Sequence, residues 1–339
     1  MKRLVSILLF SCVIITLPYR TIAAGPCCQL SSGVEESLLG TALRGGKKLF
    51  LQLTYSFTLM DKLKEGNAKK SVEDVKNAGK YTTIPTRMEM TKYTLTTAYD
   101  FSPEFTAFVS IPYIRNTMDM QILMDMGMGM EWMKHPMDPV KDLGDMTVMG
   151  LYRFYPKGEA APADMITLGA GVKTPTGSST EKSLNGSFIH AHMQPGTGSW
   201  DPVILLMYTK VVNPLLLQAD ATYQVATRNS NGYKFGDSLA ATLTGNYALF
   251  SYLKLTSGLT YLHLNEASDS EGKYTDLKSL MDDPANTGGN SIWFSPGLQV
   301  LPFKSSAVDL KVQFPLWERV RGTQLVSSYR ILLGFSYRF

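Results

Sequence analysis

Apolar and polar residues alternate with a period of two along most of the chain from Lys47 onward. In the segment 47–60, one face carries Leu49, Leu51, Leu53, Tyr55, Phe57 and Leu59, and the other face carries Gln52, Thr54, Ser56 and Thr58. The last segment, 329–339, repeats the pattern and places Arg330 and Arg338 on its polar face. Two arginines do not suit a buried protein core, but they suit a lumen that holds water. The alternation therefore predicts strands with one face toward lipid and one toward water.

The same alternation predicts twelve strands in all. They lie at 47–60, 87–101, 104–114, 144–155, 164–175, 199–212, 215–227, 236–249, 252–264, 291–302, 307–317 and 329–339. Most of them hold about ten to fourteen residues, which is long enough to cross a tilted outer-membrane barrel. The sequence thus predicts an all-β protein, a single transmembrane antiparallel β-barrel of about twelve strands with a short N-terminal periplasmic segment.

The connections between these strands alternate in length, which supports the same fold. Short connections are predicted at 100–104, 155–164, 212–215, 249–252 and 302–307, and long ones at 61–86, 115–143, 176–198, 228–235, 265–290 and 318–327. Short periplasmic turns and long outer loops are typical of bacterial barrels. An even number of strands returns both termini to the periplasmic side. The predicted location is the bacterial outer membrane, with outer-membrane lipid as a partner.

Composition excludes several other classes of protein. Hydrophobic residues make up 44% of the chain, so a disordered protein is not expected. Charged residues make up 18%, below the roughly 25% of a soluble domain. The formal net charge is +4, of which Lys2, Arg3 and Arg20 belong to the leader, so nucleic acid is not a predicted partner. A soluble, secreted sandwich or jelly roll is the alternative fold, but its strands would be shorter.

The N-terminus divides into two segments ahead of the barrel. Residues 1–24 hold two basic residues, an apolar run and small residues, which is the pattern of a secretory signal peptide. Residues 25–46 are predicted to form a periplasmic arm or a plug, and the barrel is assigned to 47–339. Cys27 and Cys28 are adjacent in the arm, where a metal, a partner cysteine or no role at all are open alternatives.

The C-terminus is predicted to carry an assembly signal. Phe339 is the last residue, and Tyr337 and Phe335 precede it at every second position. A terminal aromatic residue with this spacing resembles the signal read by the barrel assembly machinery of outer-membrane proteins. That machinery is therefore a predicted partner.

Four segments resemble one outer-membrane family. They read VSIPYI (109–114), DLGDMTVMGLYRFY (142–155), LGAGVKTPTGSS (168–179) and QPGTGSWDP (194–202). In this order they resemble the family named for the meta-pathway of phenol degradation, whose members are often described as transporters. The resemblance implies a channel for small apolar or aromatic solutes. Pro112 and Pro175 are expected at the outer ends of strands, and the glycines of these segments are expected to serve the architecture of the barrel.

Methionine is the most distinctive candidate chemistry. Ten of the 18 methionines lie in 118–149, and the candidate metal ligands there are Met118, Met120, Met124, Met126, Met128, Met130, Met133, His135 and Met137. Thioethers beside a histidine suit a soft cation such as Cu(I) or Ag(I). The competing interpretation is a flexible apolar lining for hydrophobic solutes, since methionine adapts its shape to its neighbours. No specific role is the third alternative.

No catalytic constellation stands out, and no enzyme activity or cofactor is predicted. The expected lumen-facing charges are of both signs, which predicts ion pairs and water across the lumen: Lys92, Asp100, Arg153, Lys173, Asp220, Asp309, Lys311, Arg330 and Arg338. The sequence therefore predicts an outer-membrane channel or transporter for a small, apolar or aromatic solute. The alternative function is the handling of copper or silver through the methionine-rich loop. A third class is a structural partner for envelope proteins.

Overall fold

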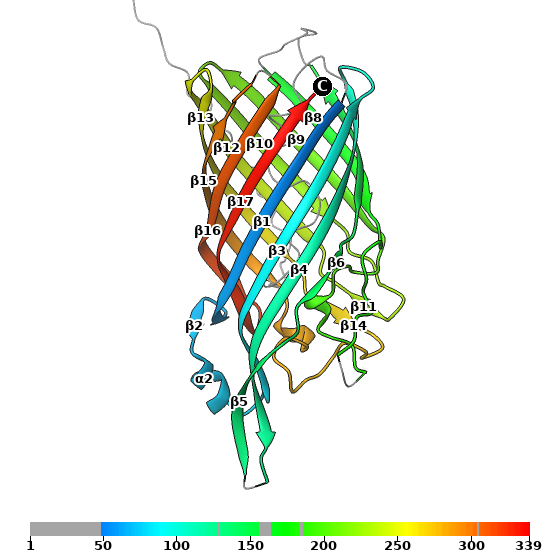
Figure 1. Ribbon diagram of the computed structural model, residues 1–339, viewed down its shortest axis with the longest axis vertical. Helices are drawn as coiled ribbons and strands as arrows, with labels where there is room; N and C mark the ends of the chain where they lie inside the picture. Colours follow the sequence, from blue (N-terminus) through cyan, green and yellow to red (C-terminus); the bar gives the residue numbers. More distant parts are fainter. Residues whose placement is uncertain (1–48, 128, 156–163, 184–185, 304) are drawn as a thin grey trace, which may run out of the picture.

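The protein is a closed antiparallel barrel of twelve strands in a computed structural model (Figure 1). The structure describes residues 49–127, 129–155, 164–183, 186–303 and 305–339. The barrel strands are β1 (Leu49–Glu65), β3 (Thr83–Asp100), β4 (Phe105–Asp125), β7 (Thr147–Phe154), β8 (Asp164–Lys173), β9 (Asp201–Val212), β10 (Leu215–Gln224), β12 (Ser238–Phe250), β13 (Leu253–Leu264), β15 (Gly289–Val300), β16 (Ser306–Val320) and β17 (Thr323–Arg338). Each of the twelve predicted strands corresponds to one of these, so the predicted fold is confirmed.

Each barrel strand pairs with its neighbour along the chain, and β17 returns to pair with β1. This last pairing runs from Phe50 opposite Arg338 to Glu65 opposite Thr323. It leaves no open edge in the barrel wall, so every strand has partners on both sides. A closed barrel is the only sheet that satisfies its backbone groups in lipid.

The two faces of the wall point as the alternation predicts. Leu243 and Thr244 are consecutive residues of β12; Leu243 is 62% exposed on the outer face, whereas Thr244 is 5% exposed on the lumen side. Exposed aromatic side chains gather near the short turns, where Tyr99 contacts Phe101 and Phe250 stacks on Tyr252. Such belts are typical of barrels at the membrane interface. No helix of the described ranges is long and apolar enough to cross a membrane.

The two ends of the barrel differ, as Figure 1 shows. The end that carries the C-terminus, at the top of the view, has short turns such as the one between β9 and β10. The opposite end carries the long connections, with β2 (Ala68–Lys70), α2 (Val72–Asn77), β5 (Met130–Pro136), β6 (Val140–Leu143), β11 (Tyr233–Lys234), β14 (Ser268–Asp269) and two 3-10 turns, η1 (Ala191–Met193) and η2 (Pro284–Asn286). We assign this end to the outside, since outer loops are the long ones.

Several connections are more regular than the sequence predicts. The expected loop 115–143 is largely strand, because β4 continues to Asp125 and pairs with β5 as a projecting hairpin. The expected loop 318–327 is a tight turn, in which Gly322 has a φ of 58°. Pro112 lies inside β4 rather than at its end. The partner of β4 changes at this point: β4 pairs with β7 up to Ser110 and with β6 from Tyr113 onward. Pro112 lies between the two pairings, so its missing amide hydrogen costs little.

The termini are described in part. The predicted signal peptide 1–24 and the arm 25–46, with Cys27 and Cys28, lie outside the described residues. The barrel wall begins at Leu49, close to the predicted start at residue 47. The side chains of Phe335, Tyr337 and Phe339 are exposed on the lipid side, and their role in assembly stays a prediction.

Candidate functional site: a pocket inside the outer mouth

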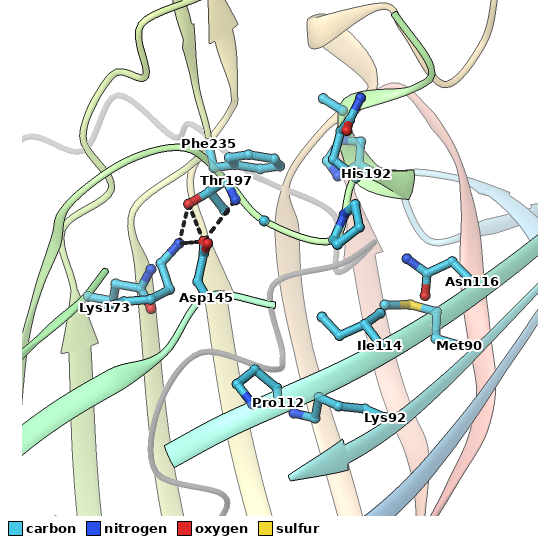
Figure 2. A pocket seen from close by; sticks show the side chains of 15 residues that line it. Met90, Lys92, Pro112, Ile114, Asn116, Asp145, Lys173, His192, Thr197 and Phe235 are labelled. Atoms are coloured by element: carbon cyan, nitrogen blue, oxygen red, sulfur yellow. Dashed lines mark hydrogen bonds and ion pairs between the residues drawn. The ribbon is translucent and has the colours of Figure 1, made fainter. Parts of the chain in front are cut away.

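A pocket lies inside the barrel between the wall and the connection that joins β8 to β9 (Figure 2). Its cavity volume is about 70 Å³. Strands β3 and β4 supply Met90, Lys92, Pro112, Ile114 and Asn116, and the rest of the lining is Asp145, Lys173, Ala191, His192, Gln194, Pro195, Gly196, Thr197, Gln224 and Phe235. Three of the four segments that carry the family resemblance supply the charged side of this pocket.

A buried ion network forms one side of the pocket. Lys173 Nζ lies 3.1 Å from Asp145 Oδ2 and 2.7 Å from Asp201 Oδ2. All three side chains are buried, and Asp201 is fully enclosed. Gln224 Nε2 donates to Asp201 Oδ2 over 3.0 Å, and the backbone amide of Thr227 donates to Asp201 Oδ1 over 2.8 Å. The network therefore satisfies two buried carboxylates with one lysine and with neutral donors.

Asp145 also fixes the connection 176–198 against the wall. Its carboxylate accepts hydrogen bonds from the amide of Gly177 at 3.0 Å, the amide of Thr197 at 2.8 Å and the hydroxyl of Thr197 at 2.6 Å. The backbones at Gly177 and Gly196 approach so closely that a Cβ on Gly196 would lie 2.3 Å from the carbonyl oxygen of Gly177. These glycines serve close backbone approach, as the sequence predicts.

The opposite side of the pocket contains His192 and Asn116 (Figure 2). His192 is buried in η1 and meets the ring of Phe235 edge-on, with 5.6 Å between the ring centroids. Burial lowers the pKa of His192 to about 4, so its imidazole is neutral at physiological pH. The neighbouring His190 contacts the carboxylate of Asp282 through Nδ1, which joins the connection 176–198 to the connection 265–288.

Three apolar clusters are buried among the described residues, and two of them bear on the passage through the barrel. The first lies at the outer mouth and is rich in methionine: Met60, Leu63, Val75, Tyr81, Ile84, Met88, Met118, Met120, Ile189, Met193, Leu280, Met281 and Leu325. We call it the mouth cluster. The second lies on the lumen side of the wall and comprises Phe50, Ala98, Phe108, Met149, Leu151, Val203, Leu205 and Met207. We call it the wall stripe.

The lumen therefore has two kinds of wall. The wall stripe is carried mainly by β7 and β9, where the sequence led us to expect polar side chains, and β1, β3 and β4 contribute one residue each. Most lumen-facing positions of β10, β12, β13 and β15 are polar instead, as predicted, and the apolar exceptions include Leu262, Leu264 and Trp293. The polar positions include Gln218, Thr242, Thr244, Asn246, Thr256, Thr260, Ser291, Ser295 and Gln299. Lumen-facing charges do form an ion pair near the periplasmic end, where Arg153 of β7 lies 3.6 Å from Asp100 of β3, but this pair runs along the wall past β4 and does not cross the lumen.

The structure separates the nine candidate metal ligands. Met118 and Met120 are buried in the mouth cluster, and Met137 packs against it. Met124, Met126, Met130 and Met133 are exposed on the projecting hairpin, as is His135, and Met128 lies outside the described residues. Within the described ranges, no group of three or more His, Cys, Asp or Glu side chains could hold a metal ion. The prediction that thioethers bind a soft cation is not tested by this finding.

Sequence reasoning missed most of the pocket. Of its charged lining residues, Lys92 and Lys173 were predicted to face the lumen, and Asp145 was not. Asp145 and Asp201 lie among the first residues of the predicted strands 144–155 and 199–212, within the quoted segments, so an acidic residue at the end of an alternating strand was the available signal. Asn116 and His192 had no such signal, because their burial depends on how the outer connections fold inward.

The fold is similar to that of solved outer-membrane proteins, although no protein-family model and no curated protein matches the sequence. The COG4313 outer membrane channel from Pseudomonas putida F1 aligns with 87% of this chain and 97% of its own, with a TM-score of 0.58 and 13% sequence identity. The P. putida toluene transporter TodX aligns with 88% of this chain and 91% of its own, with a TM-score of 0.46 and 11% identity. The protein is an outer-membrane β-barrel. The family named for the phenol meta-pathway stays a resemblance.

Proposed function

We propose that this protein is a channel through which small apolar solutes cross the bacterial outer membrane. The observation that carries the proposal is the apolar lining at two levels of the barrel, the mouth cluster outside and the wall stripe further in. A lumen that carried only water and ions would need neither. The pocket lies between the connection 176–198 and the wall, where a solute would meet it on the way inward.

The chemistry of the mouth cluster supports an apolar solute. Met60, Met88, Met118, Met120 and Met193 contribute unbranched thioether side chains to it. Such side chains change rotamer readily and make favourable contacts with aromatic rings. One solved protein of similar fold, the COG4313 protein of P. putida F1, is itself an outer-membrane channel.

Entry of an apolar solute into intact cells tests the proposal. The cells should have a complete lipopolysaccharide layer and contain an enzyme that oxidises toluene, so that consumption of toluene at limiting concentration reports its entry. Cells with the protein should consume toluene faster than cells without it. A variant with Met88, Met118 and Met120 changed to Gln should lose most of that advantage. Equal consumption with and without the protein would contradict the proposal.

The copper or silver hypothesis stays a prediction for the exposed methionines of the hairpin, and one titration decides it. Changing Met124, Met126, Met128 and Met130 to Leu keeps bulk and removes sulfur, so Cu(I) binding should fall if the thioethers are ligands. Toluene entry should not change, because volume-conserving swaps cost little and none of the three described methionines, Met124, Met126 and Met130, lines the pocket. Purified protein is titrated with Cu(I) against a competing chelator. Undiminished binding by the Leu variant, or none by the parent, removes the hypothesis.

A further inference from the structure

The polar groups of the pocket fall into two sets. Asp145, Lys173 and Thr197 satisfy one another, as the dashed lines of Figure 2 show. The second set has buried atoms with no hydrogen-bond partner among the described residues: Oδ1 of Asn116, both ring nitrogens of His192 and Oε1 of Gln224. All three residues line the same pocket.

Leaving such atoms unpaired is unfavourable. A buried polar group without a partner costs about 1–3 kcal/mol, and most such groups in folded proteins are paired. Asn116 is 2% exposed and His192 9% exposed, so bulk water does not reach them freely. Unpaired polar atoms gathered in one pocket point to a ligand that pairs with some of them.

The charge of these groups restricts the ligand. The imidazole of His192 is neutral, so it offers one N–H donor and one acceptor, while Asn116 Oδ1 and Gln224 Oε1 are acceptors. Lys173 is already paired with Asp145 and Asp201. Lys92 is the other basic side chain of the lining, and it makes an anionic ligand the alternative to be tested.

Much of the remaining lining is apolar, and the amide of Gln194 is paired within its own connection. Met90, Ile114, Pro112 and Phe235 surround the polar groups. The cavity of about 70 Å³ is less than half of the roughly 150 Å³ that accommodates a benzene molecule in an engineered protein cavity. The pocket therefore has room for the polar end of a small molecule, whose apolar body would extend toward the lumen.

We infer that the pocket binds a small neutral solute that carries one hydroxyl group on an apolar body. The hydroxyl would donate its proton to Asn116 Oδ1 and accept the N–H of His192. A hydroxyl suits this pair because it is both donor and acceptor and carries no charge. This inference rests on the proposed function, since it names the class of solute that the channel selects from among apolar ones.

Benzyl alcohol and toluene differ by one hydroxyl group and form the test pair. Their affinities for the purified full chain in detergent are measured by calorimetry, with benzoate as the charged probe. Benzyl alcohol should bind about tenfold more tightly than toluene, the size expected for one net hydrogen bond. In His192→Leu and Asn116→Leu this preference should vanish, while toluene binding is kept. Asn246→Leu is the matched control, because Asn246 is also a buried lumen amide but does not line the pocket.

The outcomes separate this inference from the proposed function. Equal affinity of the unchanged protein for benzyl alcohol and toluene overturns the inference and leaves a channel for apolar solutes. Tighter binding of benzoate than of benzyl alcohol also overturns it and assigns the pocket to anions through Lys92. Equal toluene consumption by cells with and without the protein, together with no binding of either neutral probe to the purified protein, overturns both the inference and the proposed function. Comparison of the two neutral probes on the unchanged protein needs no variant, so a variant that fails to fold does not prevent the test.

Discussion

Replacing Lys173 by methionine should destabilise the barrel by about 3–5 kcal/mol, the usual result of removing one partner from a buried ion network. Methionine keeps most of the bulk and removes the charge, so Asp145 and Asp201 would remain buried without their cation. The measurement is urea-induced unfolding of the protein in lipid vesicles, followed by tryptophan fluorescence. The unfolding midpoint should fall well below that of the unchanged protein.

A second lysine provides the matched control for this change. Lys210 pairs with Asp164 at 3.2 Å, but its side chain is 45% exposed. Exposed pairs contribute only about 0–1 kcal/mol, so Lys210→Met should change the unfolding midpoint little. Adding Asp145→Asn to Lys173→Met should restore part of the lost stability, because the second substitution removes one unpaired buried charge. Equal effects of the two lysine substitutions would contradict the view that the buried network stabilises the site.

Arginine at position 243 should cost about 2–4 kcal/mol, whereas arginine at position 244 should be tolerated. Leu243 lies on the lipid face near the middle of β12, so its replacement would place a charge in the hydrocarbon core. Thr244 faces the lumen opposite Gln218 and Gly258, and a glycine partner leaves space for a longer side chain. Heat-modifiable gel migration of the membrane fraction reports how much of each variant inserts. Equal insertion of the two variants would mean that the two faces have been assigned wrongly.

The fold could be predicted because its physical cause is local. A strand between lipid and water must alternate, so Leu243 and Thr244 reveal their faces without knowledge of any partner strand. The ends of strands could not be predicted in this way. The alternation continues beyond the membrane wherever a partner supplies hydrogen bonds, as β5 does for β4 up to Asp125. The turn at Gly322 was likewise hidden, because a two-residue turn and a longer loop share the same residue types.

The pocket was less predictable because it depends on register and on loop packing. Lys173 was expected to face the lumen, but its pairing with Asp201 follows from the alignment of β8 with β9, which one strand cannot reveal. The methionines were treated as one cluster, although they lie at different positions along the barrel axis. Met118 is buried inside the mouth, and Met124 is exposed on the hairpin beyond it. The position of His192 depends on a connection that folds back into the barrel.

The two-sided lumen has a consequence for electrical measurements on this protein. Ions and water would follow the polar side of the lumen, along β10, β12, β13 and β15, whereas an apolar solute would follow the wall stripe. The current across a planar bilayer would therefore sample only one of two parallel paths. A substitution such as Leu205→Gln could raise ionic current while it slows the passage of toluene, and Thr244→Val could do the reverse. Conductance and solute flux should accordingly vary independently from one variant to the next.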